Sequence, residues 1–230
     1  MLDPNGRVAM VSGASRGLGR YISERLLGSG FSVSAGVRDP RSLAAHDRLL
    51  VHRYDAESVE AARDWVAATA ARFGRIDALV NAAGINPMAR IADADETALD
   101  RTWLVNVKAP LRLIRHAMPH LQASGTGRVV NIASLSGKRV ANENIGYAMS
   151  KFALVALTHE VRREGWDHGV RATALCPGFV ATDMSVAARM PREQMTNAAD
   201  VAVLAETLLL LPNNAVVAEL LVNCRLEYMF

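Results

Sequence analysis

The sequence predicts an α/β fold, a doubly wound sheet of about seven parallel strands with helices on both faces. Three observations indicate it: short apolar runs rich in β-branched residues recur, stretches of helical periodicity separate them, and polar residues follow most of the runs directly. Strands that alternate with helices pair in parallel through right-handed crossovers. No internal repeat, low-complexity segment or linker interrupts the pattern, so we expect a single domain over residues 1–230.

The individual elements can be placed in order along the chain. The expected strands are the short apolar runs at 7–13, 31–37, 48–54, 75–84, 127–134, 170–178 and 215–223. Apolar residues spaced by three or four predict a helix over 59–73, with Asp55 placed to begin it, and another over about 97–121. The stretch "GYAMSKFALVALTHE" at 146–160 predicts a further helix.

The composition is that of an ordinary globular chain and argues against several classes of function. Half of the residues (50%) are hydrophobic, 21% are charged, and the net charge of +3 comes from basic residues scattered along the chain. Without a Lys/Arg block or interleaved aromatic residues, we expect no nucleic-acid partner. Without a long uncharged apolar run, we expect no membrane span.

The N-terminus lacks the pattern of a signal peptide, and two cysteines do not make a disulfide framework. We therefore expect a cytoplasmic protein. His116 and His120 have a spacing that can bind zinc on a helix, but no third ligand is near them in the sequence. We expect two surface histidines and no metal site.

A glycine-rich turn, "SGASRGLG" at 12–19, follows the first expected strand and precedes a helix. Gly13, Gly17 and Gly19 allow the backbone to approach a ligand closely. The first N–H groups of the following helix can bind a phosphate. This context indicates a site for the pyrophosphate of a dinucleotide.

The second expected strand ends in a sequence that favours NADP. An acidic residue usually binds the adenosine ribose there, but Val37 occupies that position and Arg38 follows it. Arg38 and Arg16, from the glycine-rich turn, would suit a 2′-phosphate. NADP is the preferred cofactor and NAD is possible. The alternative is that Arg38 is a solvated turn residue paired with Asp39.

Polar residues also follow the other expected strands, and the carboxyl edge of such a sheet is where ligands bind. These residues are Asp55, Asn81 to Gly84, Ser134, Ser136 and Thr182, the last one after the turn at Pro177 and Gly178. Asn106 lies inside an expected helix, where Asn is unfavourable unless it serves another purpose. Tyr147 and Lys151 are one helical turn apart and share a helix face.

In this order and spacing, the motifs resemble those of the short-chain dehydrogenase/reductase family, over nearly the whole chain. The matching elements are "SGASRGLG", "NAAG" at 81–84, Asn106, "NIAS" ending at Ser134, "YAMSK" at 147–151 and "PGFVAT" at 177–182. The resemblance implies a Rossmann fold and a tyrosine-dependent, NAD(P)-dependent oxidoreductase that interconverts an alcohol and a ketone or aldehyde. It also implies a homotetramer or homodimer.

The resemblance places the pyrophosphate in the glycine-rich turn, the adenine against Asp55 and the floor of the cofactor cleft at 81–84. With the residues argued above, the expected cofactor-binding set is Gly13, Ser15, Arg16, Gly17, Leu18, Gly19, Arg38, Asp55, Asn81, Ala82, Gly84, Tyr147, Lys151, Pro177, Gly178 and Thr182.

Tyr147, Lys151, Ser134 and Asn106 match the family's catalytic tetrad. A free tyrosine has a pKa near 10, and we expect the Lys151 ammonium, with an oxidised nicotinamide nearby, to lower it. Lys151 can also bond the nicotinamide ribose, and Ser134 would donate a hydrogen bond to the substrate oxygen. Asn106 is expected to hold a water that links Lys151 to solvent.

The chain departs from the family pattern at a few places. Ser12 stands where Thr is commoner, Ala82 replaces an Asn, and the C-terminus lacks a Gly-rich ending, which leaves the assembly interface and the pocket rim open. Lys138 and Arg139 could meet an acidic substrate, but we expect solvated loop charges. The segment after Thr182 is expected to be a mobile lid that mixes apolar and basic residues, namely Met184, Val186, Met190, Met195, Arg189 and Arg192.

Two other functions are compatible with the fold. A dinucleotide-sensing or scaffold protein would keep the fold without turnover, but it would not need Tyr147, Lys151 and Ser134 together. A sugar-nucleotide epimerase or dehydratase would need a substrate domain after the nucleotide-binding half, and only about 50 residues follow "PGFVAT".

Overall fold

The structure, a computed structural model, describes residues 1–186, 188 and 190–227. Seven strands form one parallel sheet in the order β3-β2-β1-β4-β5-β6-β7, which confirms the predicted fold class. The strands are Val8–Ser12 (β1), Ser32–Val37 (β2), Leu49–Arg53 (β3), Ala78–Asn81 (β4), Arg128–Ile132 (β5), Arg171–Pro177 (β6) and Glu219–Val222 (β7). Each lies within one of the predicted runs.

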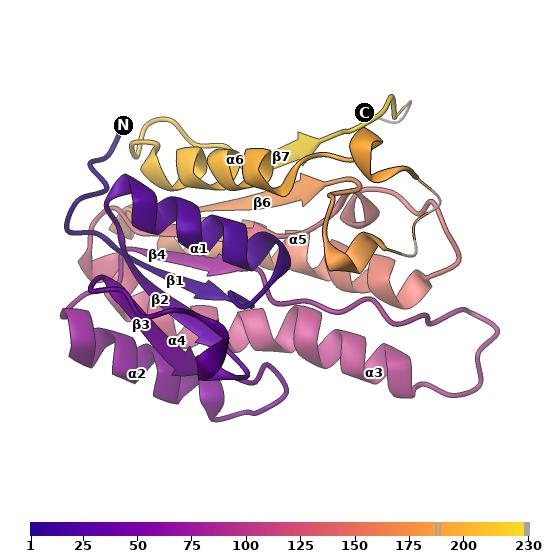
Figure 1. The fold of residues 1–230 in the computed structure, drawn as a ribbon, viewed down its shortest axis with the longest axis horizontal. Coiled ribbons are helices and arrows are strands. Elements are labelled where there is room, and N and C mark those ends of the chain that lie inside the picture. The colour runs from indigo at the N-terminus through magenta and orange to yellow at the C-terminus, as the bar shows by residue number, and fades with distance from the viewer. Residues whose placement is uncertain (187, 189, 228–230) are drawn as a thin grey trace.

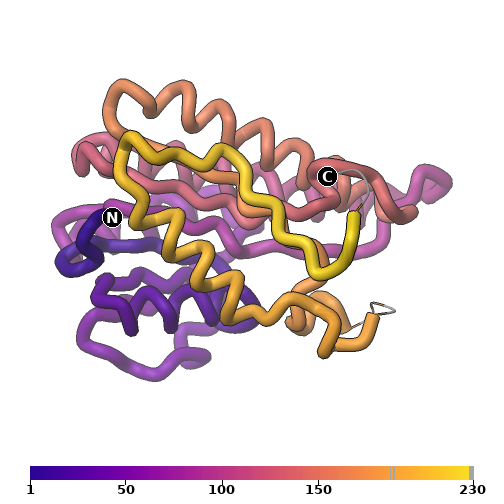
Figure 2. The backbone as a smooth tube through the Cα atoms, turned by 90° about the horizontal axis from the view of Figure 1, so that it is seen from above, coloured from indigo at the N-terminus to yellow at the C-terminus, as the bar shows by residue number. Residues whose placement is uncertain are grey.

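Helices cover both faces of the sheet, as the crossover rule requires. Their bounds are Gly17–Ser29 (α1), Ala61–Phe73 (α2), Thr97–Trp103 (α3), Ala109–Ala123 (α4), Ile145–Gly165 (α5) and Ala198–Leu210 (α6). Helices α1 and α6 pack together on one face, and α2, α4 and α5 lie on the other (Figures 1 and 2). The apolar core is correspondingly divided into two main clusters, one on each side of the sheet.

The helices predicted over 59–73 and 97–121 differ from the observed helices in detail. Helix α2 begins at Ala61, and Asp55 does not begin it, because the Asp55 carboxylate accepts a hydrogen bond from the Glu57 N–H in a preceding turn (3.0 Å). The helix predicted over 97–121 contains a π-helical segment, Leu104–Lys108, between α3 and α4. Such segments occur frequently at functional sites, and this one contains Asn106.

The strand order changes direction between β1 and β4. From β1 the chain builds the sheet outwards through β2 and β3 on one side, and from β4 it builds through β5, β6 and β7 on the other. In doubly wound sheets this switch point, at the carboxyl ends of the strands, is where ligands bind. In Figure 1 the arrowheads of β1, β6 and β7 point towards the side where the orange segment after β6 lies. The site therefore has to be sought at that edge.

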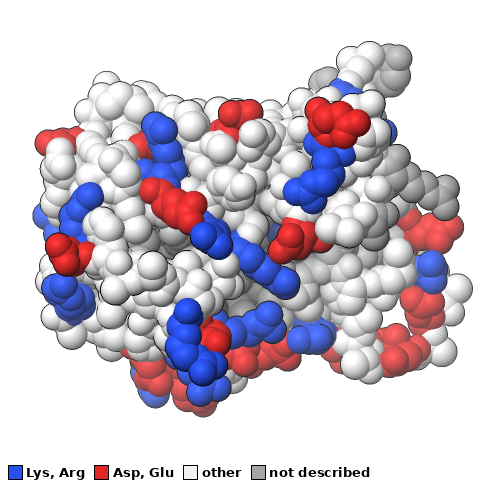
Figure 3. All heavy atoms as spheres, viewed as in Figure 1, with Lys and Arg blue, Asp and Glu red and all other residues white. Residues whose placement is uncertain are grey.

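Basic and acidic side chains alternate over the face shown in Figure 3, without a continuous basic stripe. None of the described helices is both long enough and apolar enough to cross a bilayer. Within the described residues, no group of three or more His, Cys, Asp and Glu side chains is arranged to hold a metal ion. His116 and His120 lie half-buried on α4.

Candidate active site

The glycine-rich turn packs directly against the segment that follows β4. Gly13 has φ +69°, and a Cβ there would lie 2.8 Å from the Ala83 Cα. A Cβ at Gly19 would overlap the Gly13 carbonyl oxygen. Both glycines are therefore required by close backbone approach. The Ser12 hydroxyl accepts hydrogen bonds from the N–H groups of Ala82 and Ala83, each at 3.1 Å, and joins the two segments.

The start of α1 is suited to an anion. Arg16 is the N-cap residue, its side chain makes no capping hydrogen bond, and no acidic residue lies in the first helical turn. The free N–H groups and the helix dipole favour a negative charge there. Ser15, Gly17 and Leu18 are partly exposed at this end of the helix. A bare, glycine-lined cradle at a helix N-terminus fits a pyrophosphate.

Arg38 is exposed just beyond β2, and it forms no ion pair or side-chain hydrogen bond with the rest of the described chain. The alternative is a pair between Arg38 and Asp39. Asp39 instead binds Arg41 through two hydrogen bonds of 3.0 Å, so Arg38 is available for a ligand. Asp55 is also exposed, two residues beyond β3.

The side chain of Asn81 joins neighbouring elements of the sheet. Its side chain is buried and donates to Asn131 (2.8 Å), which in turn donates to Thr158 of α5 (2.8 Å). This chain of hydrogen bonds ties β4 and β5 to α5, so the Asn81 amide supports the sheet. Ala82 is partly buried and contributes to the floor through its backbone bond to Ser12.

Tyr147, Lys151 and Ser134 lie together at the carboxyl end of β5. The Lys151 Nζ is 5.5 Å from the centre of the Tyr147 ring. Ser134 follows β5, its hydroxyl accepts from the Ser136 N–H (3.0 Å), and it is near enough to Tyr147 to affect the pKa of the phenol. A Cβ at Gly84 would lie 3.8 Å from the Lys151 Nζ, so the end of the "NAAG" segment borders the same site.

The pKa shifts of this cluster are governed by burial. Burial raises the pKa of the Tyr147 phenol to about 12, and the neighbouring Ser134 hydroxyl acts in the opposite direction. Burial lowers the pKa of Lys151 to about 8. Lys151 is not among the groups that shift the pKa of Tyr147 here, and its expected effect together with an oxidised nicotinamide stays a prediction. The Lys151 ammonium donates to the Ile132 carbonyl at 2.7 Å, and desolvation dominates at the phenol.

The Asn106 side chain binds the backbone of the segment that follows β4. Its Oδ1 accepts from the Ile85 N–H (2.9 Å), and its Nδ2 donates to the Ile85 carbonyl (2.9 Å) and to the Ser150 hydroxyl (3.1 Å). Both amide groups are thus committed to protein partners. These contacts give Asn106 a positioning role, and its expected role in holding a water stays a prediction.

The segment after β6 approaches the glycine-rich turn. A Cβ at Gly17 would lie 3.8 Å from the Thr182 Cβ, and the Gly178 N–H donates to the Val222 carbonyl (2.9 Å), just after Pro177 ends β6. Arg192 donates to the carbonyls of Ala181 (3.1 Å) and Thr182 (3.4 Å), which fixes the base of the predicted lid.

The residues of the predicted lid are not equivalent. Met184 and Val186 are exposed, whereas Met195 is buried in the protein interior. The Met190 sulfur lies 3.8 Å from the Cys224 sulfur, in the C-terminal segment. Arg189 lies outside the described residues. Met184 and Val186 are therefore the apolar residues of this segment that are open to a ligand, and the mobility of the lid stays a prediction.

Lys138 and Arg139 are engaged by the C-terminal segment. Lys138 pairs with Glu219 at 2.6 Å, and Arg139 forms two hydrogen bonds with Glu227, at 2.9 and 2.7 Å. The Arg139–Glu227 side chains are only 10% and 14% exposed. The prediction of solvated loop charges is wrong for both residues, because acidic residues far along the chain pack against them.

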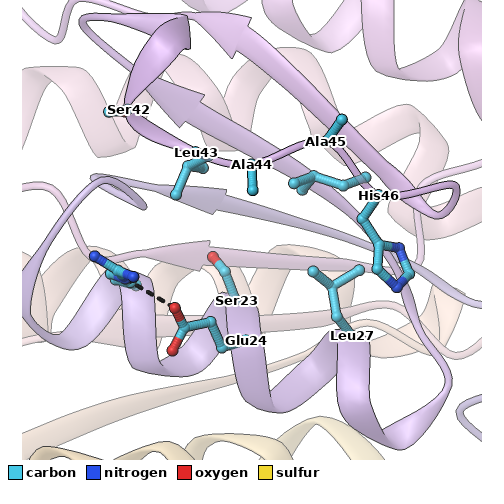
Figure 4. Close-up of a pocket in the computed structure, with 10 residues that line it drawn as sticks. Ser23, Glu24, Leu27, Ser42, Leu43, Ala44, Ala45 and His46 are labelled. Atoms are coloured by element: carbon cyan, nitrogen blue, oxygen red, sulfur yellow. Dashed lines mark hydrogen bonds and ion pairs between the residues drawn. The ribbon is translucent and has the colours of Figure 1, made fainter.

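A hollow of about 240 Å³ lies elsewhere, between α1 and the segment before β3 (Figure 4). Leu27 and Leu43 line it together with Ser23, Glu24 and His46. None of the predicted site residues is among its lining residues. Its position, beside the helix and away from the strand ends, separates it from the tetrad.

A parallel sheet with a glycine-rich turn after its first strand defines the Rossmann-fold class of dinucleotide-binding proteins. Within that class, the family model described as short chain dehydrogenase matches residues 7–193, and the chain belongs to this family. The structure superimposes with a TM-score of 0.88 on an alcohol dehydrogenase from the archaeon Thermococcus sibiricus complexed with 5-hydroxy-NADP, at 26% identity, covering 96% of this chain and 99% of that one.

Two curated relatives are similar in sequence. An agropine synthesis reductase of Rhizobium rhizogenes is 40% identical over 96% of this chain, which spans about half (53%) of the relative's length. A 3beta-hydroxysteroid dehydrogenase 2 of Eggerthella lenta is 33% identical over 82% of this chain and 76% of its own. These two relatives are named as a reductase and a dehydrogenase.

Proposed function

We propose that the protein is an NADP-dependent oxidoreductase that interconverts an alcohol and a ketone or aldehyde. The observation that carries the proposal is the clustering of Tyr147, Lys151 and Ser134 at the same sheet edge as the glycine-rich turn. When bound, the dinucleotide supplies hydride transfer, and the protein supplies the proton and the orientation.

Each member of the cluster has a role that follows from its contacts. Tyr147, with a pKa raised to about 12, is protonated at neutral pH and acts as the general acid in the reductive direction. Ser134, next to that phenol, donates to the substrate oxygen and stabilises the charge that develops there. Lys151 holds the nicotinamide ribose, and Asn106 positions the backbone at Ile85.

We propose the cofactor-binding set inferred from the sequence, in which the Asn81 side chain supports the cleft through its hydrogen bond to Asn131. The glycine-rich turn holds the pyrophosphate, while Arg16 and Arg38, both exposed, bind the 2′-phosphate. The alcohol dehydrogenase described with 5-hydroxy-NADP supports the same choice. NAD remains the second cofactor.

We propose a small carbonyl or alcohol compound as the substrate, in line with the names of the two curated relatives. A homodimer or homotetramer is supported by large apolar side chains exposed on neighbouring helices, Trp103, Leu111, Met149 and Phe152. A cytoplasmic location is supported by Cys176 and Cys224, which are both free thiols. We treat residues 1–230 as one domain.

A panel assay tests the proposal. NADPH and NADH oxidation are followed spectroscopically against ketones, aldehydes and ketoacyl thioesters. We expect turnover of at least one ketone or aldehyde class, faster with NADPH. Cofactor binding without turnover of any compound would favour the alternative, a dinucleotide-sensing or scaffold protein.

A further inference from the structure

Asn144 is a buried residue beside the site that the sequence patterns did not single out. It is 6% exposed and is the N-cap residue of α5, three positions before Tyr147. Its Oδ1 accepts from the N–H groups of Tyr147 (3.3 Å) and Ala89 (3.1 Å). Its Nδ2 donates to the Asn86 Oδ1 (2.8 Å) and the Pro87 carbonyl (2.9 Å).

These four bonds use the whole hydrogen-bonding capacity of a primary amide, which has two N–H groups and two acceptor lone pairs. A helix cap alone needs only one of them, the bond from the Tyr147 N–H. The other three bonds reach a segment that is more than fifty positions away in the sequence, residues 86–89. Asn144 therefore does more than begin a helix.

Segment 86–89 and the start of α5 are also in direct contact. The Gly146 N–H donates to the Ala89 carbonyl at 3.2 Å, and a Cβ at Gly146 would lie 2.8 Å from the Ala89 Cβ. The same segment continues from Ile85, which Asn106 holds on its other side. The backbone next to Tyr147 is thus joined to the chain that leaves the "NAAG" segment.

We propose that Asn144 is a positioning residue, which holds Tyr147 and segment 86–89 at a fixed separation across the substrate site. The inference rests on the proposed function, because it makes Tyr147 the acid that must be positioned. A buried amide that is fully bonded resists displacement, since each broken bond leaves a desolvated partner. Proton transfer is sensitive to displacements of about 1 Å, so the separation affects turnover.

The substitution Asn144→Ser separates capping from bridging. Serine caps a helix about as well as asparagine, so the bond from the Tyr147 N–H is kept. Its single hydroxyl donor cannot replace the two bonds donated to Asn86 and Pro87. The matched control is Asn197→Ser, since Asn197 caps α6 through the Ala199 N–H (3.0 Å) and makes no bridge of this kind among the described residues.

We expect Asn144→Ser to lower kcat by at least about tenfold at a temperature well below its Tm, with the Kd for NADPH unchanged. Asn197→Ser should keep the wild-type kcat. A further variant, Asn86→Ala, removes one bridging partner, and its effect should not add to that of Asn144→Ser, because both break the same contact. An Asn144→Ser enzyme with more than half of the wild-type kcat would overturn the positioning role.

Amide hydrogen exchange tests the bridge independently of turnover. The Ala89 amide should lose protection in Asn144→Ser and retain it in Asn197→Ser. Unchanged protection of Ala89 would overturn the inference even if activity fell. If the wild-type protein reduced no carbonyl compound at all, the proposed function would fail, and this exchange measurement would still decide whether Asn144 holds segment 86–89.

Discussion

The cofactor side and the substrate side of the site are built in different ways. On the cofactor side, the turn after β1 is shaped by glycines within seven positions of one another and by backbone overlap that only glycine avoids. On the substrate side, contacts between distant parts of the chain hold the walls: Asn144 with segment 86–89, and Arg139 with Glu227. The first side is specified by a local motif and the second by tertiary packing.

This difference has consequences for mutation. A change in the local turn should abolish cofactor binding outright, because the backbone itself forms the binding surface. A change in one long-range contact should alter stability or substrate handling and leave cofactor binding intact.

Gly13→Ala should eliminate measurable NADPH binding, a loss of more than about 1,000-fold or about 4 kcal/mol. Strain at φ +69° adds to the overlap with the Ala83 backbone. Isothermal titration with NADPH measures the effect. The control is Gly28→Ala, since nothing lies within 4 Å of a Cβ there and alanine favours the helix. Wild-type affinity in Gly13→Ala would contradict a backbone-built cofactor side.

Lys151→Met should change the pH dependence of stability. The folded-state pKa of Lys151 is about 8 and its ordinary value is 10.5, so the unfolded state binds the proton more tightly. Below pH 8 the folded protein carries the cost of the buried charge, about 3 kcal/mol, and this cost disappears as the pH rises towards 10.5. The variant removes the charge.

Urea unfolding of both proteins, from pH 7 to pH 10.5, measures this effect. The free energy of unfolding of the variant relative to wild type should be highest at pH 7 and should decline with rising pH. A difference that does not depend on pH would mean that Lys151 is not desolvated in the unliganded protein.

Arg38→Asp should reduce the preference for NADPH over NADH by at least about tenfold, or 1.4 kcal/mol. The substitution removes a phosphate partner and adds a carboxylate that repels the 2′-phosphate. Fluorescence titration with both cofactors measures it, and the wild-type preference should weaken with salt. Arg41→Ala is the control, since Arg41 is bound to Asp39. Equal affinities for both cofactors in the wild type would remove the argument for NADP.

Glu227→Gln should destabilise the protein by about 1 kcal/mol, because the neutral amide keeps one acceptor for Arg139 and loses the charge. The exposed pair of Arg90 and Glu143 gives the control, and Glu143→Gln should change stability by less than about 0.5 kcal/mol. Thermal unfolding measures both. The Kd for NADPH should stay at its wild-type value. A large rise would contradict the claim that long-range contacts on the substrate side do not affect cofactor binding.

The comparison also explains what the sequence could predict. The seven strands and the glycine-rich turn depend on patterns within a few residues, and their places were predicted. Tyr147 and Lys151 are one helical turn apart, so their proximity could also be read locally. The proximity of Ser134 to these two residues could be predicted only from the resemblance to the family, because Ser134 follows β5 and lies thirteen positions before Tyr147.

The long-range contacts were not predictable in the same way. Asn144 looks like an ordinary N-cap in the sequence, and only the packing of segment 86–89 against α5 reveals its other bonds. Lys138 and Arg139 looked solvated because Glu219 and Glu227 lie more than eighty positions further along the chain. The burial that raises the pKa of Tyr147 is likewise a property of packing.

The most direct test of the account is the kcat of Tyr147→Phe, measured together with its Kd for NADPH. Removing the phenolic hydroxyl deletes the proton donor and leaves the ring and the glycine-rich turn in place. We predict a fall in kcat of at least about 100-fold, with the Kd within about twofold of wild type. A variant that keeps more than a tenth of the wild-type kcat would contradict the assignment of Tyr147 as the acid.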